Sequence, residues 1–170
     1  KGEIGTEIRQ KCSLITSANV FNELNEDSKM PPEYYAKRYT DKIMSYINAA
    51  EEKTKILLVE PGTPKAARLV SNMRDAFIRK KFYPVAPCSH INECPMNGSR
   101  GGKWCNLSFS TDDAPAELKK LSEKSLLPKD RAVLSFVAAI KHSYVDELEK
   151  LAETYDVNEI EKKYNIFEKY

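Results

Sequence analysis

The chain has 170 residues, of which 41% are hydrophobic and 31% are charged, and its formal net charge is +2. This length allows one domain with a hydrophobic core, and this composition excludes a disordered or fibrous chain. Because the charge is nearly balanced, any contact with nucleic acid must come from a local basic patch.

The first third of the chain predicts a strand and a helix. Residues 12–16 form a short, mostly apolar run that is typical of a buried strand, and residues 17–24 lead from it through a turn. Between residues 33 and 51, apolar side chains recur at helical spacing. We therefore expect a strand, a connecting turn and an amphipathic helix in this order.

A second strand and helix follow directly. Residues 55–60 form a continuous apolar strand, as expected inside a parallel sheet that is covered on both faces. Thr63 is a good N-cap residue and Pro64 suits the first helical position. The helix that begins there is expected to reach about residue 80.

The rest of the chain predicts shorter elements around a cysteine-containing loop. The expected elements are strands at residues 82–86, 104–109 and 132–140, a charged helix at residues 116–125, and a helical tail at residues 143–170. This order predicts an α/β fold with a mainly parallel sheet.

The chain contains neither a GxGxxG nor a GxxxxGK[ST] motif. A nucleotide-binding fold should carry a glycine-rich turn after its first strand. We therefore expect either a fold that binds no nucleotide-like cofactor or one from which the first half of the sheet is missing. The chain begins with Lys1 and not with Met, which indicates a fragment or a processed product.

The most informative segment is the loop of residues 87–105, where Cys88, Cys94 and Cys105 are separated by six and eleven positions. Thiolates near a low-dielectric interior need a cation or a cluster to offset the cost of ionisation, so we expect a metal site. The spacing suits zinc and an iron–sulfur cluster equally well. Three unliganded loop thiols are the alternative.

The sequence does not identify a fourth ligand. Cys12 lies 76 positions before Cys88, in a different strand, and is more typical of a buried thiol. His90 is close enough in sequence to bind a metal, which would favour zinc, but it would equally suit a hydrogen-bonding position behind the ligands.

Only four cysteines occur, which is too few for a disulfide scaffold and favours a reducing compartment. No apolar run approaches the length of a membrane span, and residues 1–10 do not have the pattern of a signal peptide. We therefore expect no membrane contact.

Two segments follow strands at the edge where open α/β sheets bind ligands. The first is EPGTP, residues 60–64, where helix N–H groups would hold an anion. A capped tight turn with a surface glutamate is the alternative. The second contains Asn19 and Asn22. We expect Asn19, Asn22 and Glu60 to lie at the same edge.

Arg79, Lys80 and Lys81 are followed by Phe82 and Tyr83. Basic residues next to aromatic ones suit contact with RNA. The alternative is a basic helix terminus that is favoured by the helix dipole alone.

The segments NVFNEL, LLVEPGTP, APCSHINECP and WCNLSFS occur in this order. They resemble a methyltransferase-like family that associates with the small ribosomal subunit in mitochondria and in many bacteria. The resemblance covers residues 13–139, and its most specific part is EPGTP followed by the PC-x-H-x-x-x-CP loop and the W-C pair.

The resemblance implies a class I, S-adenosylmethionine-type Rossmann fold with an iron–sulfur cluster, of the 4Fe–4S type, on the cysteine loop. By motif, Cys88, Cys94 and Cys105 match three cluster cysteines. The family's fourth cysteine lies downstream of the W-C pair, whereas no cysteine follows Cys105 here. Zinc remains the alternative metal.

The family's glycine-rich cofactor turn belongs to an N-terminal half that this chain does not contain. The resemblance therefore implies that residues 1–142 are the C-terminal half of a Rossmann-like methyltransferase domain. In the full-length protein, Asn19, Asn22 and Glu60 would border the S-adenosylmethionine and substrate cleft, and the fragment alone is expected to be inactive.

The expected function is that of an S-adenosylmethionine-dependent rRNA methyltransferase-like protein in small ribosomal subunit assembly and translation, with rRNA and ribosomal proteins as partners. A non-catalytic assembly factor with a structural or sensing iron–sulfur or zinc loop is the alternative, and a zinc-bearing RNA-binding module ranks below both. The preferred location is the bacterial cytoplasm, with the mitochondrial matrix expected for a eukaryotic protein.

Overall fold

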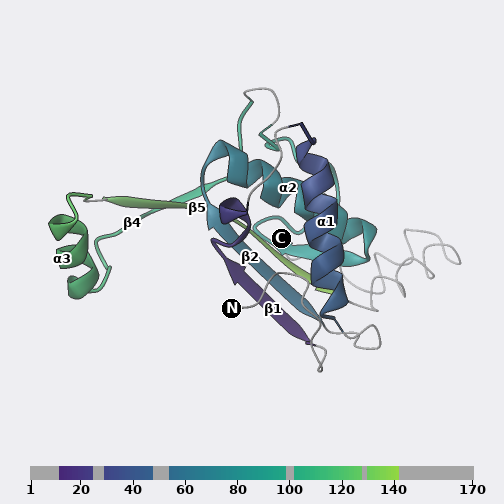
Figure 1. The fold of residues 1–170 in the computed structure, drawn as a ribbon, viewed down its shortest axis with the longest axis horizontal. Helices are drawn as coiled ribbons and strands as arrows, with labels where there is room; N and C mark the ends of the chain where they lie inside the picture. The colour runs from purple at the N-terminus through teal and green to yellow at the C-terminus, as the bar shows by residue number, and fades with distance from the viewer. Residues whose placement is uncertain (1–11, 25–28, 48–53, 99–101, 128–129, 142–170) are drawn as a thin grey trace, which may run out of the picture.

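Five strands, three α-helices and one short 3-10 helix make up the part of the chain that the computed structural model describes, residues 12–24, 29–47, 54–98, 102–127 and 130–141 (Figure 1). The strands are β1 (Leu14–Ala18), β2 (Lys55–Pro61), β3 (Phe82–Ala86), β4 (Leu107–Ser110) and β5 (Arg131–Lys141). The helices are η1 (Phe21–Glu23), α1 (Pro32–Ser45), α2 (Pro64–Arg79) and α3 (Ala116–Lys124). The predicted helical tail lies outside the described residues.

The strands form one mixed sheet in the order β1-β2-β5-β3, with β4 also paired to β5. Only β1 and β2 pair in parallel, because β5 runs antiparallel to β2, β3 and β4. The expected α/β class is confirmed and is consistent with part of a Rossmann-like sheet. The expectation of a mainly parallel sheet is wrong for these strand pairs, since an apolar run predicts burial but not strand direction.

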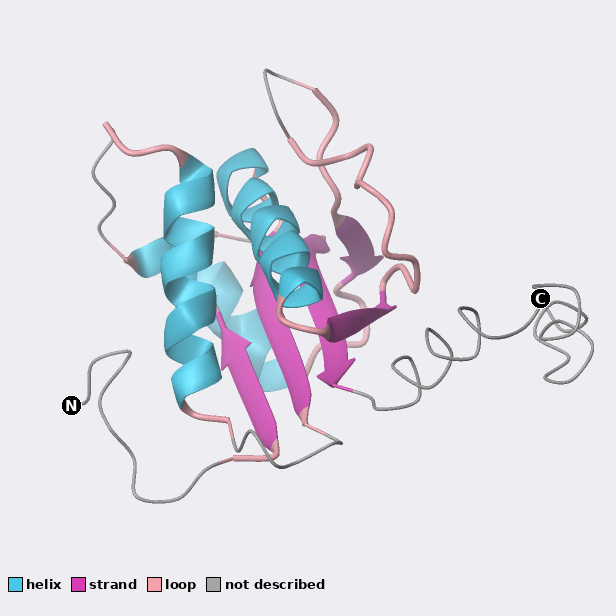
Figure 2. Cartoon of the chain, turned by 90° about the vertical axis from the view of Figure 1, so that its right-hand side faces the viewer, coloured by secondary structure: helices cyan, strands magenta, loops and turns pink. Residues whose placement is uncertain are grey.

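The helices α1 and α2 lie side by side over one face of the sheet (Figure 2). Alternate residues of β2 point into this layer, so Ile56 and Leu58 are buried whereas Leu57 is only half-buried. From the helix side, Met73 and Phe77 of α2 complete the core. The period of two in burial is the pattern of a strand that is fully covered on one face.

The start of α2 is the clearest agreement with the sequence. The Thr63 hydroxyl accepts a hydrogen bond from Ala66 N at 3.3 Å, and Pro64 is the first helical residue. The helix ends at Arg79, and Lys81 takes a left-handed conformation with φ of 64°. The predicted N-cap is therefore confirmed.

Two expectations about strands need correction. The first strand is not buried: β1 has a neighbour on only one side among the described residues, and Leu14 is 57% exposed. The strand expected from residue 104 begins only at Leu107, because Trp104 makes just an isolated bridge with Asn97.

The hairpin of β4 and the start of β5 carries α3 away from the helix-covered part of the sheet (Figure 1). All four residues of β4 are exposed and α3 has no buried residue. The cysteine loop joins β3 to β4 and lies against residues 135–137 in the middle of β5. No helix in the described part of the chain is long and apolar enough to cross a membrane.

Candidate functional site

The EPGTP turn and the W-C pair, which are 42 positions apart, contact each other directly. The Trp104 indole N–H donates to the Gly62 carbonyl at 3.0 Å, and Gly62 N donates to the Val133 carbonyl at 3.0 Å. A Cβ at position 62 would lie 2.3 Å from Val133 Cγ1 and 2.9 Å from its carbonyl carbon, so this approach requires glycine. The turn thus anchors the far end of the cysteine loop.

A second set of hydrogen bonds fixes Cys105 over the sheet. Cys105 N donates to the Met96 carbonyl at 3.0 Å, which closes the loop on itself. The hydroxyl of Ser135, which is 1% exposed in β5, donates to the Cys105 carbonyl at 2.6 Å. The backbone of Cys105 is therefore held from both sides.

Arg74 of α2 holds the segment between the first two cysteines. Its guanidinium donates to the carbonyls of His90 and Asn92, the latter at 3.1 Å, and lies 3.3 Å from His90 Nδ1. It also pairs with Asp75 at 2.9 Å. Arg74 is only 7% exposed, and an arginine is buried to this extent only when it is well paired. Its position is consistent with holding this loop.

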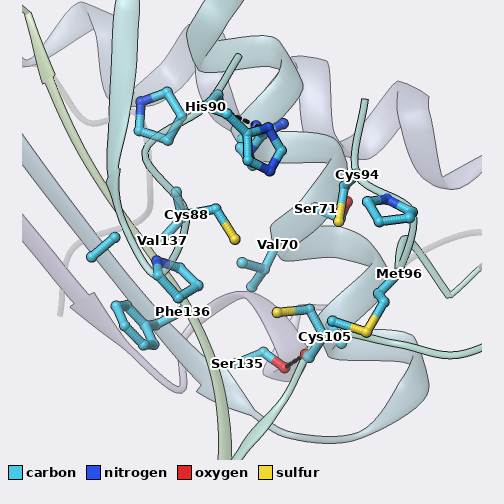
Figure 3. A pocket seen from close by; sticks show the side chains of 16 residues that line it. Val70, Ser71, Cys88, His90, Cys94, Met96, Cys105, Ser135, Phe136 and Val137 are labelled. Atoms are coloured by element: carbon cyan, nitrogen blue, oxygen red, sulfur yellow. Dashed lines mark hydrogen bonds between the residues drawn. The ribbon is translucent and has the colours of Figure 1, made fainter. Parts of the chain in front are cut away.

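The loop encloses a cavity of about 120 Å³ against α2, β3 and β5. Cys88, Cys94, Cys105 and His90 all line it, and Figure 3 shows the three sulfur atoms pointing into the space in front of Val70. Most of the remaining wall is apolar and comes from Val70, Pro84, Phe136 and Val137, among others. The structure therefore brings the four predicted metal-site residues to one cavity.

The three thiols affect one another electrostatically. Burial raises the pKa of the Cys105 thiol, and the negative charges of Cys94 and then Cys88 raise it further. Three thiolates around one apolar cavity therefore repel each other, and a bound cationic group would offset this repulsion.

The described residues do not themselves form a metal site. In the described part of the chain, no group of three His, Cys, Asp or Glu side chains is close enough together to hold a metal ion. The sequence predicted a cysteine-rich metal loop, and what the structure contains is a loop whose thiols surround a cavity. The donor chemistry, three thiols on mostly apolar walls, fits a sulfur-ligated group.

At the carboxyl end of β2, Glu60 is 1% exposed, so its interpretation as a surface glutamate is wrong. Its carboxylate accepts hydrogen bonds from the backbone N–H groups of Val20 at 3.2 Å, Phe21 at 3.0 Å and Asn22 at 3.2 Å. Both oxygens are thus engaged by the segment that follows β1. Glu60 therefore holds the segment that follows β1 in place at this edge of the sheet.

Asn22 and the EPGTP turn share a second cavity, of about 190 Å³, at the start of α2. It is lined by Phe21, Asn22, Pro61 and Thr63, among others. Asn19 and Glu60 are not among its lining residues. Of the three residues predicted to border a cofactor cleft, Asn22 therefore lines this cavity, whereas Asn19 and Glu60 do not.

In the basic and aromatic segment of residues 79–83, the first aromatic ring is not accessible to RNA. Phe82 is 2% exposed and belongs to the core, whereas Lys80 pairs with Asp41 of α1 at 2.8 Å. These contacts favour the interpretation of this segment as a basic helix terminus over its interpretation as an RNA contact.

Sequence reasoning missed Ser71 and Arg74, which both line the cysteine cavity. A signal was available, since Ser71 and Arg74 each stand four positions after an apolar residue of this helix, Ala67 and Val70, and so share its apolar face. Polar residues on a predicted buried face need partners, and here the loop supplies those of Arg74.

Comparison with known families gives one match. Residues 6–155 match the model of a family described as mitochondrial small ribosomal subunit Rsm22. No curated protein matches the chain.

Proposed function

Because the chain belongs to the Rsm22 family, we propose that it is part of a methyltransferase-like protein that acts in small ribosomal subunit assembly and translation. The family resemblance that the sequence motifs indicated is confirmed by the match over residues 6–155. We further propose that S-adenosylmethionine binds in the full-length protein, that rRNA and ribosomal proteins are its partners, and that the cysteine loop holds an iron–sulfur cluster.

The observation that carries the cluster proposal is the convergence of Cys88, Cys94 and Cys105 on one cavity. The loop is held there by three separate anchors, which are the Trp104 indole on Gly62, the Ser135 hydroxyl on Cys105, and the buried guanidinium of Arg74. A loop whose thiols served only for packing would not need this set of buried polar contacts.

We propose a cluster in preference to zinc because the family resemblance implies one. A single zinc ion requires its cysteine sulfurs to converge at about 2.3 Å from one point. In a cluster, each cysteine binds a different iron, so the thiols surround the group at larger separations. The described residues contain no group of three potential ligands close enough for one ion, so the preference for a cluster rests on the family resemblance.

Within this site the residues have distinct roles. Cys88, Cys94 and Cys105 would hold the cluster, which supplies one-electron chemistry or structural stability when bound. Arg74 holds the backbone between the first two thiols through the carbonyls of His90 and Asn92. His90 lines the same cavity, but its Nδ1 atom faces Arg74.

The alternative function is a non-catalytic assembly factor in which the cluster is structural or sensing. One observation favours it: Glu60, predicted to border the cofactor cleft, uses both carboxylate oxygens to anchor the backbone of residues 20–22. Asn22 is then the residue of the predicted cofactor set that lines the cavity at the start of α2.

Variants of the full-length protein separate the two functions. Asn22→Ala should abolish rRNA methylation while small subunits still accumulate if the protein is an enzyme, and should leave methylation unchanged if it is a scaffold. Cys105→Ser should reduce small-subunit accumulation in both cases, because it removes one of the three thiols that would hold the cluster. Normal subunits and normal methylation in Cys105→Ser would contradict the proposal.

The family description also bears on location. It names mitochondria, so it gives no support to the preferred expectation of a bacterial cytoplasm. We propose the mitochondrial matrix, where small ribosomal subunits of that organelle are assembled.

A further inference from the structure

Ser71 is a buried polar residue of the cysteine cavity whose hydroxyl makes no hydrogen bond. It lies in α2 and is 5% exposed, and it lines the cavity together with the three cysteines (Figure 3). Its Oγ atom has no hydrogen-bond partner among the described residues. A buried polar atom of this kind calls for an explanation, and a bound group is one of the recognised ones.

The neighbouring polar groups are satisfied, which makes Ser71 distinct. The Ser135 hydroxyl on the opposite wall donates to the Cys105 carbonyl at 2.6 Å. The Arg74 guanidinium donates to two loop carbonyls and to Asp75. A helical serine normally turns its hydroxyl back to the carbonyl four residues earlier, and Ser71 does not.

The chemistry of the cavity shows what this hydroxyl suits. The thiols of Cys88, Cys94 and Cys105 become acceptors when ionised, and the inorganic sulfides of a cluster are acceptors too. A hydroxyl donor aimed at sulfur in an apolar cavity is strong, because few other partners compete for it.

We propose that Ser71 Oγ–H donates a hydrogen bond to a sulfur atom of the group held by Cys88, Cys94 and Cys105, and that it thereby raises the reduction potential of that group. This inference rests on the proposed iron–sulfur site. A hydrogen bond to sulfur would stabilise the reduced, more negative form of such a group more than its oxidised form. Ser71 Oγ would keep its proton in both forms.

The test is a redox titration of the anaerobically purified protein, followed by its visible absorbance. Ser71→Ala removes the hydroxyl, adds no volume and suits a helix. We expect this variant to retain its iron and to have a more negative potential. The expected change is at least threefold in the reduction equilibrium constant, or about 28 mV, because a tenfold change is about 59 mV for one electron.

Thr40→Val is the matched control. The Thr40 hydroxyl in α1 is also buried, at 1% exposure, and also lacks a partner among the described residues, but it does not line the cysteine cavity. Its substitution should leave the potential unchanged. An equal shift in both variants would overturn the inference, because the effect would then not come from the cavity.

The remaining outcomes also decide the question. A Ser71→Ala protein with the wild-type potential overturns the inference and leaves the proposed cluster intact. If Ser71→Ala loses its iron, Ser71→Thr, which keeps the hydroxyl, should retain iron at the wild-type potential, and its failure to do so overturns the inference. A wild-type protein without iron overturns the proposed cluster and this inference together.

Discussion

Replacing Glu60 with glutamine removes the charge that holds residues 20–22 to the end of β2. Glu60 accepts three backbone hydrogen bonds, two at Oε1 and one at Oε2, and it is 1% exposed. In Glu60→Gln, the amide group turns one acceptor into a donor, so at least one N–H group loses its partner. The other two hydrogen bonds lose their charge assistance and about half of their strength.

The magnitude follows from these contacts. A hydrogen bond to a charged group contributes about 1.5–3 kcal/mol, and a neutral one about 1 kcal/mol. In Glu60→Gln one hydrogen bond is lost and two are weakened, and the Val20 and Asn22 donors are only partly buried. Together these changes lower the free energy of unfolding by about 3 kcal/mol. At a slope of about 2 kcal/mol/M, the urea midpoint should fall by about 1.5 M.

Glu23→Gln is the control, since Glu23 is exposed in η1 and should change the urea midpoint little. Urea unfolding followed by circular dichroism measures both variants. If Glu60→Gln unfolded at the wild-type urea concentration, the carboxylate would not be an anchor, and a role for Glu60 toward a ligand would become the better explanation.

Three further predictions concern the cysteine loop. Gly62→Ala should lower the free energy of unfolding by about 1–3 kcal/mol, since its Cβ would overlap β5. The control Gly102→Ala, at an exposed position, should change it little. Equal urea midpoints for the two variants would contradict this prediction. Iodoacetamide at pH 8 should modify exposed Cys88 faster than Cys105, whose raised pKa leaves less thiolate, and peptide mass spectrometry showing the reverse order would refute it. Arg74→Lys keeps the charge but loses the forked donor geometry, so it should retain less iron after anaerobic purification than the wild type, and equal iron content would be evidence against a positioning role.

Capping and hydrophobic patterns predicted those elements that are determined by neighbouring residues. The Thr63–Pro64 start of α2 follows from N-capping, and the apolar run of residues 132–140 matches most of β5. The cysteine loop was found because three thiols at short spacing rarely serve packing alone. These features depend on neighbouring residues and can be read without the fold.

The missed features depend on contacts between distant segments. The direction of β5 is set by how the chain returns through the β4 and α3 extension, which burial patterns do not encode. The burial of Glu60 was not predicted, because its hydrogen-bond partners lie 38 to 40 positions earlier. Ser71 and Arg74 face a loop that begins 13 residues or more after them, so only their polarity on a buried helix face pointed to them.

The central claim is that the three cysteines hold an iron–sulfur cluster, and elemental analysis with a visible spectrum of the anaerobically purified protein tests it most directly. We expect iron and acid-labile sulfide in similar amounts, a coloured protein, and loss of both elements and of the colour in Cys88→Ser, Cys94→Ser and Cys105→Ser. Colourless protein without iron, or protein with a single zinc ion, would contradict it.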